Sequence, residues 1–229
     1  MYTCIPTVIQ ACLNDCRNTC NIAIMKTLSI LSRKGGVGKT TLALHLAVCA
    51  SHKRKETVLL DLDPQASASD WGDSREADEP VIMSCQSARL QQTLEKAAEH
   101  AAELAIIDTA PHAEAASLTA ARLSDLVLIP CKPAILDIRA IGHTIDIIQL
   151  AKVDAVVVLN TVPPKGSIIE ETRDAIEGLG IEVCPVMVGQ RVAFSHSLIT
   201  GNTAQEYQSK GKAASEITQL YRWIMKRLS

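Results

Sequence analysis

Short apolar runs alternate along this chain with longer segments in which apolar residues recur every three or four positions. The short runs predict strands at 26–31, 57–62, 81–84, 104–108, 125–130, 154–159 and 181–186. The longer segments predict helices at about 40–52, 87–102, 113–123, 135–151, 167–178, 191–199 and 212–227. Because such alternation requires right-handed crossovers, we expect an α/β fold: a doubly wound, mostly parallel sheet of about seven strands with helices on both faces. Ligands of such sheets bind beyond the carboxyl ends of the strands.

Two segments fall outside this alternation. Residues 70–80 are acidic and rich in turn-forming residues, so we expect a solvated connection there. Residues 1–24 precede the main domain of 25–229, and we expect an extension that is loosely attached or that comes from an upstream start codon. Alternatively, three cysteines spaced four apart in this extension bind a metal or pair with another chain. Neither a nearby histidine nor a pair of Cys-x-x-Cys motifs supports a zinc site.

Composition narrows the functional classes. The chain has 229 residues, enough for one α/β domain, and its formal net charge of −2 excludes a uniformly basic surface. Binding to nucleic acid would therefore need a local basic patch.

Four scattered cysteines lie in apolar segments, as in proteins of a reducing compartment: Cys49, Cys85, Cys131 and Cys184. No apolar run approaches the ~20 residues of a membrane span, and the start lacks a secretory pattern, so we expect a cytoplasmic protein.

Segment 32–41, which reads Ser-Arg-Lys-Gly-Gly-Val-Gly-Lys-Thr-Thr, follows the first predicted strand and opens a helix. It resembles a phosphate-binding loop, except that Arg33 stands where the first glycine belongs. Glycines allow backbone N–H groups to surround phosphate oxygens, and the helix start adds its positive end. Lys39 is expected at the β and γ phosphates, and the hydroxyl of Thr40 is expected as a Mg²⁺ ligand. The residues predicted to contact the nucleotide are Gly35, Gly36, Val37, Gly38, Lys39, Thr40 and Thr41.

Carboxylates end two other predicted strands. Asp61 and Asp63 lie two positions apart, so the pleat directs both to the same side. Asp108 ends the strand at 104–108, in the manner of a Walker B acid that holds the metal through water. For Asp61 the alternative is that it only caps the next segment.

Together these motifs identify a resemblance to the ParA/MinD family of deviant Walker A ATPases, with the carboxyl-terminal part closest to ParA-type proteins. The resemblance covers about 26–229 and is carried by 34–41, 61–65, 107–111, 129–133 with Asp137, 189–194 and 212–217. It implies a P-loop fold, ATP and Mg²⁺ as cofactors, and slow ATP hydrolysis that a partner stimulates.

The resemblance also implies roles for single residues. Two ATP-bound subunits close face to face, and Lys34 reaches the partner's phosphates; the alternative for Lys34 is a solvated surface lysine. Lys39 and Asp63 complete the catalytic set, with Asp63 orienting the attacking water and Asp61 near the metal shell beside Asp108. Asn160 stands where the family recognises adenine, unless it only forms the turn before Pro163 and Pro164.

A basic patch is predicted near the carboxyl terminus, since 205–229 carries a net charge of +3. The predicted DNA-binding residues are Arg191, Lys210, Lys212, Arg222, Lys226 and Arg227. The alternatives are an ordinary solvated helix face and, as in MinD-like relatives, a helix that lies on a membrane surface. The apolar residues of that helix are Ile217, Leu220, Tyr221, Ile224 and Leu228. A reductase like the nitrogenase iron protein would need cysteines within 108–117, which has none.

We therefore expect a homodimer in the ATP-bound state that binds double-stranded DNA without sequence preference and positions a cargo. The first choice of cargo is a plasmid or chromosome, and the second is a protein assembly such as a carboxysome. The resemblance implies a ParB-like or other small adaptor and a cytoplasmic, nucleoid-associated location, with no membrane partner. The alternative function is a MinD-like membrane-surface ATPase that regulates cell division or protein placement.

Overall fold

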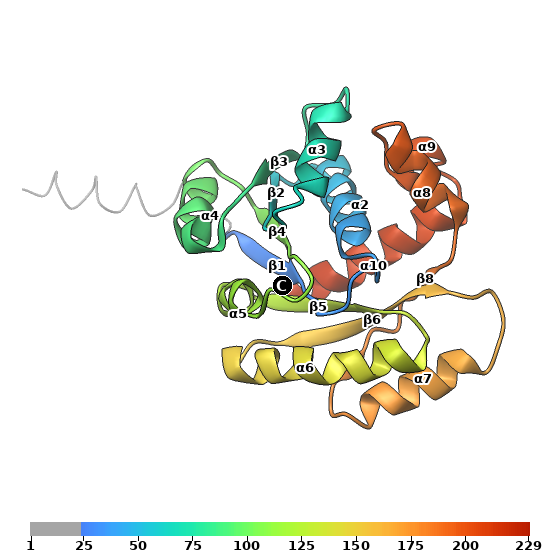
Figure 1. The fold of residues 1–229 in the computed structure, drawn as a ribbon. Coiled ribbons are helices and arrows are strands. Elements are labelled where there is room, and N and C mark those ends of the chain that lie inside the picture. The colour runs from blue at the N-terminus through green and yellow to red at the C-terminus, as the bar shows by residue number, and fades with distance from the viewer. Residues whose placement is uncertain (1–23) are drawn as a thin grey trace, which may run out of the picture.

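The structure is a computed structural model that describes residues 24–229. The predictions for residues 1–23, including the cysteine site, lie outside the described residues. Eight strands form one sheet in the order β3-β2-β4-β1-β5-β6-β7, with β8 paired to β6, and every strand pairing is parallel (Figure 1). The predicted doubly wound sheet is confirmed, and β1 lies at its centre.

The strands are β1 (Lys26–Ile30), β2 (Thr57–Asp61), β3 (Val81–Ser84), β4 (Leu104–Asp108), β5 (Leu126–Cys131), β6 (Ala155–Val162), β7 (Glu182–Val183) and β8 (Val188–Gly189). The helices are α2 (Lys39–His52), α3 (Ser67–Ser74), the 3₁₀ helix η1 (Ser87–Arg89), α4 (Leu90–Glu99), α5 (Glu114–Arg122), α6 (Ile135–Ala151), α7 (Ile168–Glu177), α8 (Val192–Ile199), α9 (Ala204–Tyr207) and α10 (Lys212–Leu228).

Each face of the sheet carries its own apolar core. Alternate strand residues such as Leu28, Ile106 and Val156 pack beneath α2, α3, α8 and α10. Their neighbours, such as Ile107 and Val157, pack beneath α4, α5, α6 and α7 on the opposite face (Figure 1). Burial on both faces explains why the strands appear in the sequence as continuous apolar runs rather than as alternating ones.

Three predicted segments differ from the observed ones. The expected connection 70–80 overlaps α3, because Ala68 and Trp71 are buried and stabilise a helix that its acidic and small residues do not favour. The expected strand 181–186 is shortened to the two residues of β7, and β8 follows outside the expected range. The pairing of β6 with β8 shifts register between Asn160 and Val162. The expected helix 87–102 begins as the 3₁₀ turn η1 and ends at Glu99.

The apolar stripe of α10 packs into the core. Ile217, Leu220, Tyr221, Ile224 and Leu228 are all buried beside α2 and the sheet. All five side chains are taken up by the core, so the stripe leaves no apolar surface that could lie on a membrane. The interpretation of this stripe as a membrane-surface helix is therefore wrong, and the packing alternative is confirmed.

Candidate nucleotide site

The loop between β1 and α2 has the backbone of an anion-binding cradle. Gly36 and Gly38 have φ values of 72° and 93°, a conformation that side chains disfavour. A Cβ at Gly38 would lie 2.4 Å from Nδ2 of Asn160, so only glycine fits there. Asn160 in turn donates from Nδ2 to the carbonyl oxygen of Val37 at 2.7 Å. The predicted residue from β6 therefore shapes the loop, while its contact with adenine stays a prediction.

Lys39 is the first residue of α2 and is only 6% exposed. Its Nζ donates to the carbonyl oxygen of Lys34 at 3.4 Å, so the side chain curls back along the loop. Burial lowers the pKa of Lys39, and the nearby Asp108 and Asp63 partly oppose that shift. A desolvated ammonium at a helix start is well placed to bind an anion.

Asp108 at the end of β4 is 1% exposed, and neither of its carboxylate oxygens meets a hydrogen-bond donor among the described residues. Burial, reinforced by the carboxylates of Asp61 and Asp63, raises the pKa of Asp108 to about 7, although Thr40 and Lys39 act in the opposite direction. A buried acid without a donor fits a cation. Thr40 and Asp108 would hold Mg²⁺, which commonly uses one or two carboxylates together with phosphate oxygens.

Asp61 lies directly beside Asp108, because the two are register partners in β2 and β4. Its oxygens accept hydrogen bonds from three backbone N–H groups: Asp63 at 2.9 Å, Ala68 at 2.9 Å and Ser69 at 3.2 Å. Asp61 therefore caps α3, which was the alternative that the sequence left open. Its place near the metal shell stays a prediction, since a carboxylate has room for further partners.

Asp63 lies in the loop from β2 to α3. Its Oδ1 accepts a hydrogen bond from the backbone N–H of Gln65 at 2.9 Å, and its carbonyl accepts one from Ala66 at 2.8 Å. A cleft of about 720 Å³ opens beside it, between the ends of β2 and β3 and the start of α5. The loop thus presents a carboxylate at the carboxyl edge of the sheet, next to Asp108.

Lys34 forms an ion pair with a residue of α6. Its Nζ lies 2.5 Å from Oδ2 of Asp137, whose side chain is 4% exposed and whose Oδ1 has no partner among the described residues. Lys34 is therefore not a freely solvated surface lysine. Asp137 was visible in the sequence only through the family resemblance, because no local pattern signals a pairing between the loop and a distant helix.

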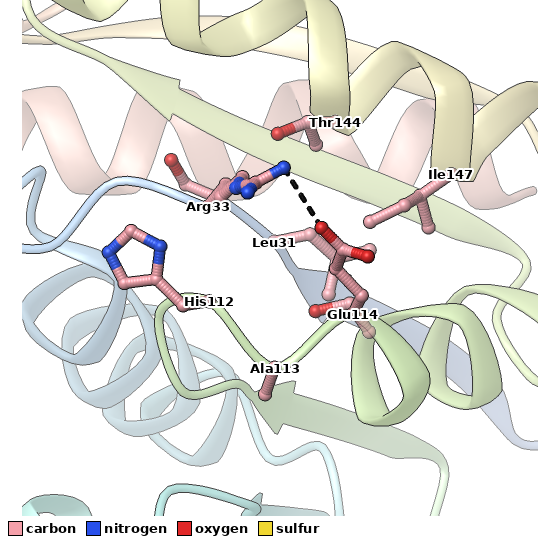
Figure 2. A pocket seen from close by; sticks show the side chains of 9 residues that line it. Leu31, Arg33, His112, Ala113, Glu114, Thr144 and Ile147 are labelled. Atoms are coloured by element: carbon pink, nitrogen blue, oxygen red, sulfur yellow. Dashed lines mark ion pairs between the residues drawn. The ribbon is translucent and has the colours of Figure 1, made fainter.

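Arg33, to which the sequence assigned no role, pairs with Glu114 at the start of α5. Nη1 of Arg33 lies 2.9 Å from Oε1 of Glu114, and Figure 2 shows this pair beside Thr144 and Ile147 of α6. The side chains are 36% and 63% exposed, so the pair contributes at most about 1 kcal/mol. It nevertheless joins the phosphate loop to the segment that follows Asp108.

The six predicted DNA-binding residues fall into two groups. Arg191 pairs with Glu216, which raises its pKa, and Arg227 pairs with both Asp154 and Glu182. The other four are exposed and form no ion pair within residues 24–229: Lys210, Lys212, Arg222 and Lys226. Only the second group therefore carries uncompensated positive charge.

Replacing Asp108 with asparagine should stabilise the nucleotide-free protein. Because the pKa of Asp108 is raised to about 7, ionising this carboxyl destabilises the folded state, by roughly 1.4 kcal/mol for each pH unit between that pKa and the pKa of an ordinary aspartate. The wild type loses this full amount of stability above pH 7. The loss becomes smaller as the pH falls toward the pKa of an ordinary aspartate. Chemical unfolding should therefore show a larger gain for Asp108→Asn at about pH 8.5 than at about pH 5.5. A variant less stable than the wild type at the higher pH would show that the carboxylate has a partner.

No helix among the described residues is long and apolar enough to cross a bilayer.

Comparison with known proteins places these motifs in a wider group. A family model described as the CobQ/CobB/MinD/ParA nucleotide binding domain matches residues 28–204, a span that contains the phosphate loop, Asp108 and Asn160. The chain is 30% identical over 205 residues to maintenance of carboxysome distribution protein A of Halothiobacillus neapolitanus, covering 85% of this chain and 94% of that protein. It is 26% identical over 214 residues to protein ParA of Rhizobium radiobacter, covering 84% and 91%.

The fold has counterparts among solved structures. The chain superposes on the ATP complex of Cyanothece McdA with a TM-score of 0.70 and 18% sequence identity, covering 89% of this chain and 96% of that chain. At this identity the match concerns the fold alone, and it agrees with the doubly wound sheet that the sequence predicts.

Proposed function

The chain belongs to the CobQ/CobB/MinD/ParA nucleotide-binding family, and from this premise we propose that it is an ATP-hydrolysing switch that positions a cargo on DNA. The observation that carries the proposal is the presence of two lysines at one phosphate loop. Lys39 lies along its own loop, whereas Lys34 is turned away from the loop toward Asp137 of α6. One lysine thus suits the local phosphates, and the other suits those of a second subunit.

The phosphate loop would bind the triphosphate of ATP through the N–H groups of 35–41 and through Lys39. Thr40 and Asp108 would hold Mg²⁺, which neutralises phosphate charge when it is bound. The unpartnered oxygens of Asp108 support this assignment. Asn160 shapes the loop through Val37, and we keep its contact with adenine as a separate proposal.

Asp63 would orient the water that attacks the γ-phosphate. Its position beside an open cleft at the carboxyl edge supports this role, because the cleft gives water access to the loop of Asp63. Lys34 from a second subunit would stabilise the developing charge across the interface. Hydrolysis should be slow, because the described residues supply no further cation at the phosphates. Arg33 lies next to Lys34 in the loop, but it is bound to Glu114.

ATP would favour the homodimer, because only the triphosphate attracts the second subunit's Lys34. A dimer unites two copies of the basic surface, which we define as Lys210, Lys212, Arg222 and Lys226. Lys210 and Arg222 line a groove of about 500 Å³ together with the hydroxyl groups of Ser215 and Thr218. Such a groove suits phosphate oxygens of double-stranded DNA, and two linked surfaces bind far better than one.

The relatives' names bear on the cargo. The protein of Halothiobacillus is named for carboxysome distribution, which favours a protein assembly over a plasmid as the cargo of this chain. The chromosome partitioning protein ParA of Myxococcus xanthus, to which the chain is 26% identical over 253 residues, keeps plasmid or chromosome partition as the second candidate. Either cargo would need a ParB-like or small adaptor that stimulates hydrolysis, and DNA binding would place the protein at the nucleoid.

The test of the proposal uses Asp63→Ala, which should keep ATP uncleaved and hold the protein as a DNA-binding dimer. In this background, reversing Arg222 and Lys226 to glutamate should weaken DNA binding by about tenfold or more at moderate salt, because each dimer loses four phosphate contacts. Gel shifts and fluorescence anisotropy with an unrelated duplex would measure this change. ATP affinity should stay the same.

Arg227→Gln is the matched control, since Arg227 lies on the same helix but is already neutralised by Asp154 and Glu182. It should change DNA affinity by less than about twofold. Equal losses of DNA affinity in both variants would show that paired and unpaired cations contribute alike to DNA binding. Unaltered DNA binding after reversal of Arg222 and Lys226 would show that α10 has a purely structural role.

A further inference from the structure

Arg75 is a buried arginine directly after α3. Its side chain is 4% exposed, and its guanidinium donates to both oxygens of Glu206, at 3.0 and 3.3 Å. It also donates to the carbonyl oxygens of Gly201 at 3.2 Å, Glu79 at 2.8 Å and Ala77 at 3.2 Å. Burying a charge is costly unless it is paired and hydrogen-bonded, and this arginine meets both conditions.

Further contacts tighten the same junction. The guanidinium of Arg75 lies 5.0 Å from the ring centre of Trp71, and the indole N–H of Trp71 donates to the carbonyl oxygen of Leu198 at 3.1 Å. Gly201 has a φ of 68°, and a Cβ there would lie 3.1 Å from Cα of Arg75. The carboxyl end of α3 is thus clamped against the turn that joins α8 to α9.

Glu206 belongs to α9 and serves both sides of this junction. Besides Arg75, it accepts hydrogen bonds from the backbone N–H of Thr203 at 2.7 Å and from its hydroxyl at 3.0 Å, which completes the capping box of α9. Burial alone would raise the pKa of Glu206, but the hydrogen bonds from Arg75 and Thr203 outweigh it and hold the pKa below its usual value. The carboxylate stays ionised and paired.

The opposite end of α3 is attached to the nucleotide site. Asp61 accepts hydrogen bonds from the N–H groups of Ala68 and Ser69, and the intervening loop carries Asp63. A helix as short as α3 has little stability of its own, so its contacts determine where it lies. The loop of Asp63 therefore joins two fixed elements. These are the end of β2 and helix α3, whose far end is held at Arg75.

Beyond α9 the chain leads directly to the basic surface. Lys210 and Lys212 follow Tyr207, the last residue of α9, by a few positions, and α3 and α9 both pack against α2 on one side of the sheet (Figure 1). The pair of Glu206 and Arg75 thus lies between the segment of the exposed lysines, which follows α9 in the chain, and helix α3, which follows the loop of Asp63.

We propose that Arg75 is a positioning residue: paired with Glu206, it fixes α3 so that Asp63 is held for hydrolysis, and it links Asp63 to the segment of Lys210 and Lys212. The inference rests on the proposed roles of Asp63 and of the basic surface. Arg75 itself contacts neither nucleotide nor DNA, so its loss should change the rate of hydrolysis and the response to DNA rather than the affinity for ATP.

The test uses two mild variants, Arg75→Lys and Glu206→Gln, which keep side-chain volume but break the bidentate pair. Each should slow single-turnover hydrolysis of saturating ATP by about tenfold or more, since a small misplacement of a catalytic group is costly. ATP affinity should stay within about twofold, and any effect of DNA on the rate should disappear. Hydrogen exchange of the amides in 62–66 should become faster, because those amides depend on the placement of the loop.

Lys55→Ala is the matched control. It removes a different ion pair, with Glu103, just before β2 and β4, which involves no residue of α3 or α9. Thermal unfolding of all three variants identifies any general loss of stability, and the control should leave both hydrolysis and exchange in 62–66 unchanged.

Two results separate this inference from the proposed function. Hydrolysis and exchange like those of the wild type in both Arg75→Lys and Glu206→Gln would overturn the positioning role. A wild-type protein without any hydrolysis that depends on Asp63 would overturn the proposed function, whereas faster exchange of 62–66 in Arg75→Lys would still support the clamp. Exchange requires no catalysis, so the clamp can be tested in either case.

Discussion

Replacing Lys39 with alanine is expected to weaken binding of MgATP by at least about 100-fold. The ammonium is buried at the first turn of α2, where it can form charge-assisted hydrogen bonds with two phosphates, and each such bond contributes about 1.5–3 kcal/mol. Every 1.4 kcal/mol corresponds to about tenfold in affinity. Isothermal calorimetry with a slowly hydrolysed ATP analogue would measure the loss directly.

The nucleotide-free variant should remain folded. Burial lowers the pKa of Lys39, so the cation is held at a cost in the free protein, and its removal takes away only one long hydrogen bond, to the carbonyl oxygen of Lys34. Lys53→Ala at the other end of α2 is the control, because Lys53 is exposed and lies away from the loop. Unchanged affinity in Lys39→Ala, with normal unfolding, would contradict the assignment of the phosphate loop.

The sequence predicts those parts of the fold whose determinants are local. Strands such as β4 and β5 are buried at every position, so each appears as an unbroken apolar run. The phosphate loop is equally visible, because glycine at positions 36 and 38 is required by the backbone itself. Boundaries at these elements agree with the predicted ones to within a residue or two.

Elements that depend on distant contacts were not predicted. Helix α3 contains small and acidic residues, and it forms because Trp71 is buried and Asp61 caps its first turn. Helix α9 differs from α3, because it has a local signal in the sequence. Its four residues follow a capping box in which Thr203 and Glu206 lie three positions apart. Ion pairs such as Arg75 with Glu206 join segments far apart in the chain, which no spacing rule detects.

The same limit applies to the basic patch. Counting charges within 205–229 treats every arginine and lysine alike, but the carboxylates that neutralise Arg227 come from Asp154 and Glu182, outside that segment. Arg191 is neutralised by Glu216, which lies on α10 itself. The net charge of the segment therefore does not show which of its cations are available to DNA, since its two glutamates are also paired, Glu206 with Arg75 and Glu216 with Arg191.

Replacing Lys34 with alanine is expected to leave ATP affinity within about threefold of the wild type, yet to abolish ATP-dependent dimerisation and hydrolysis. Lys39 and the loop backbone already serve the local phosphates, so Lys34 contributes little to binding within one subunit. Its charge matters when a partner's triphosphate faces it. Light scattering coupled to gel filtration, with Asp63→Ala as the ATP-trapped background, would measure the dimer.

Asp137→Asn is the matched counterpart, because it removes the carboxylate that holds Lys34 in the single subunit but keeps the lysine. To reach across an interface Lys34 must leave Asp137 in each of the two subunits, so this variant should dimerise at least as well as the wild type. The dimer should be up to about 30-fold tighter if each of the two pairs is worth about 1 kcal/mol. The two substitutions should thus act in opposite directions although they remove the same ion pair. Dimerisation of Lys34→Ala with ATP would show that the second lysine is not the link between nucleotide and assembly.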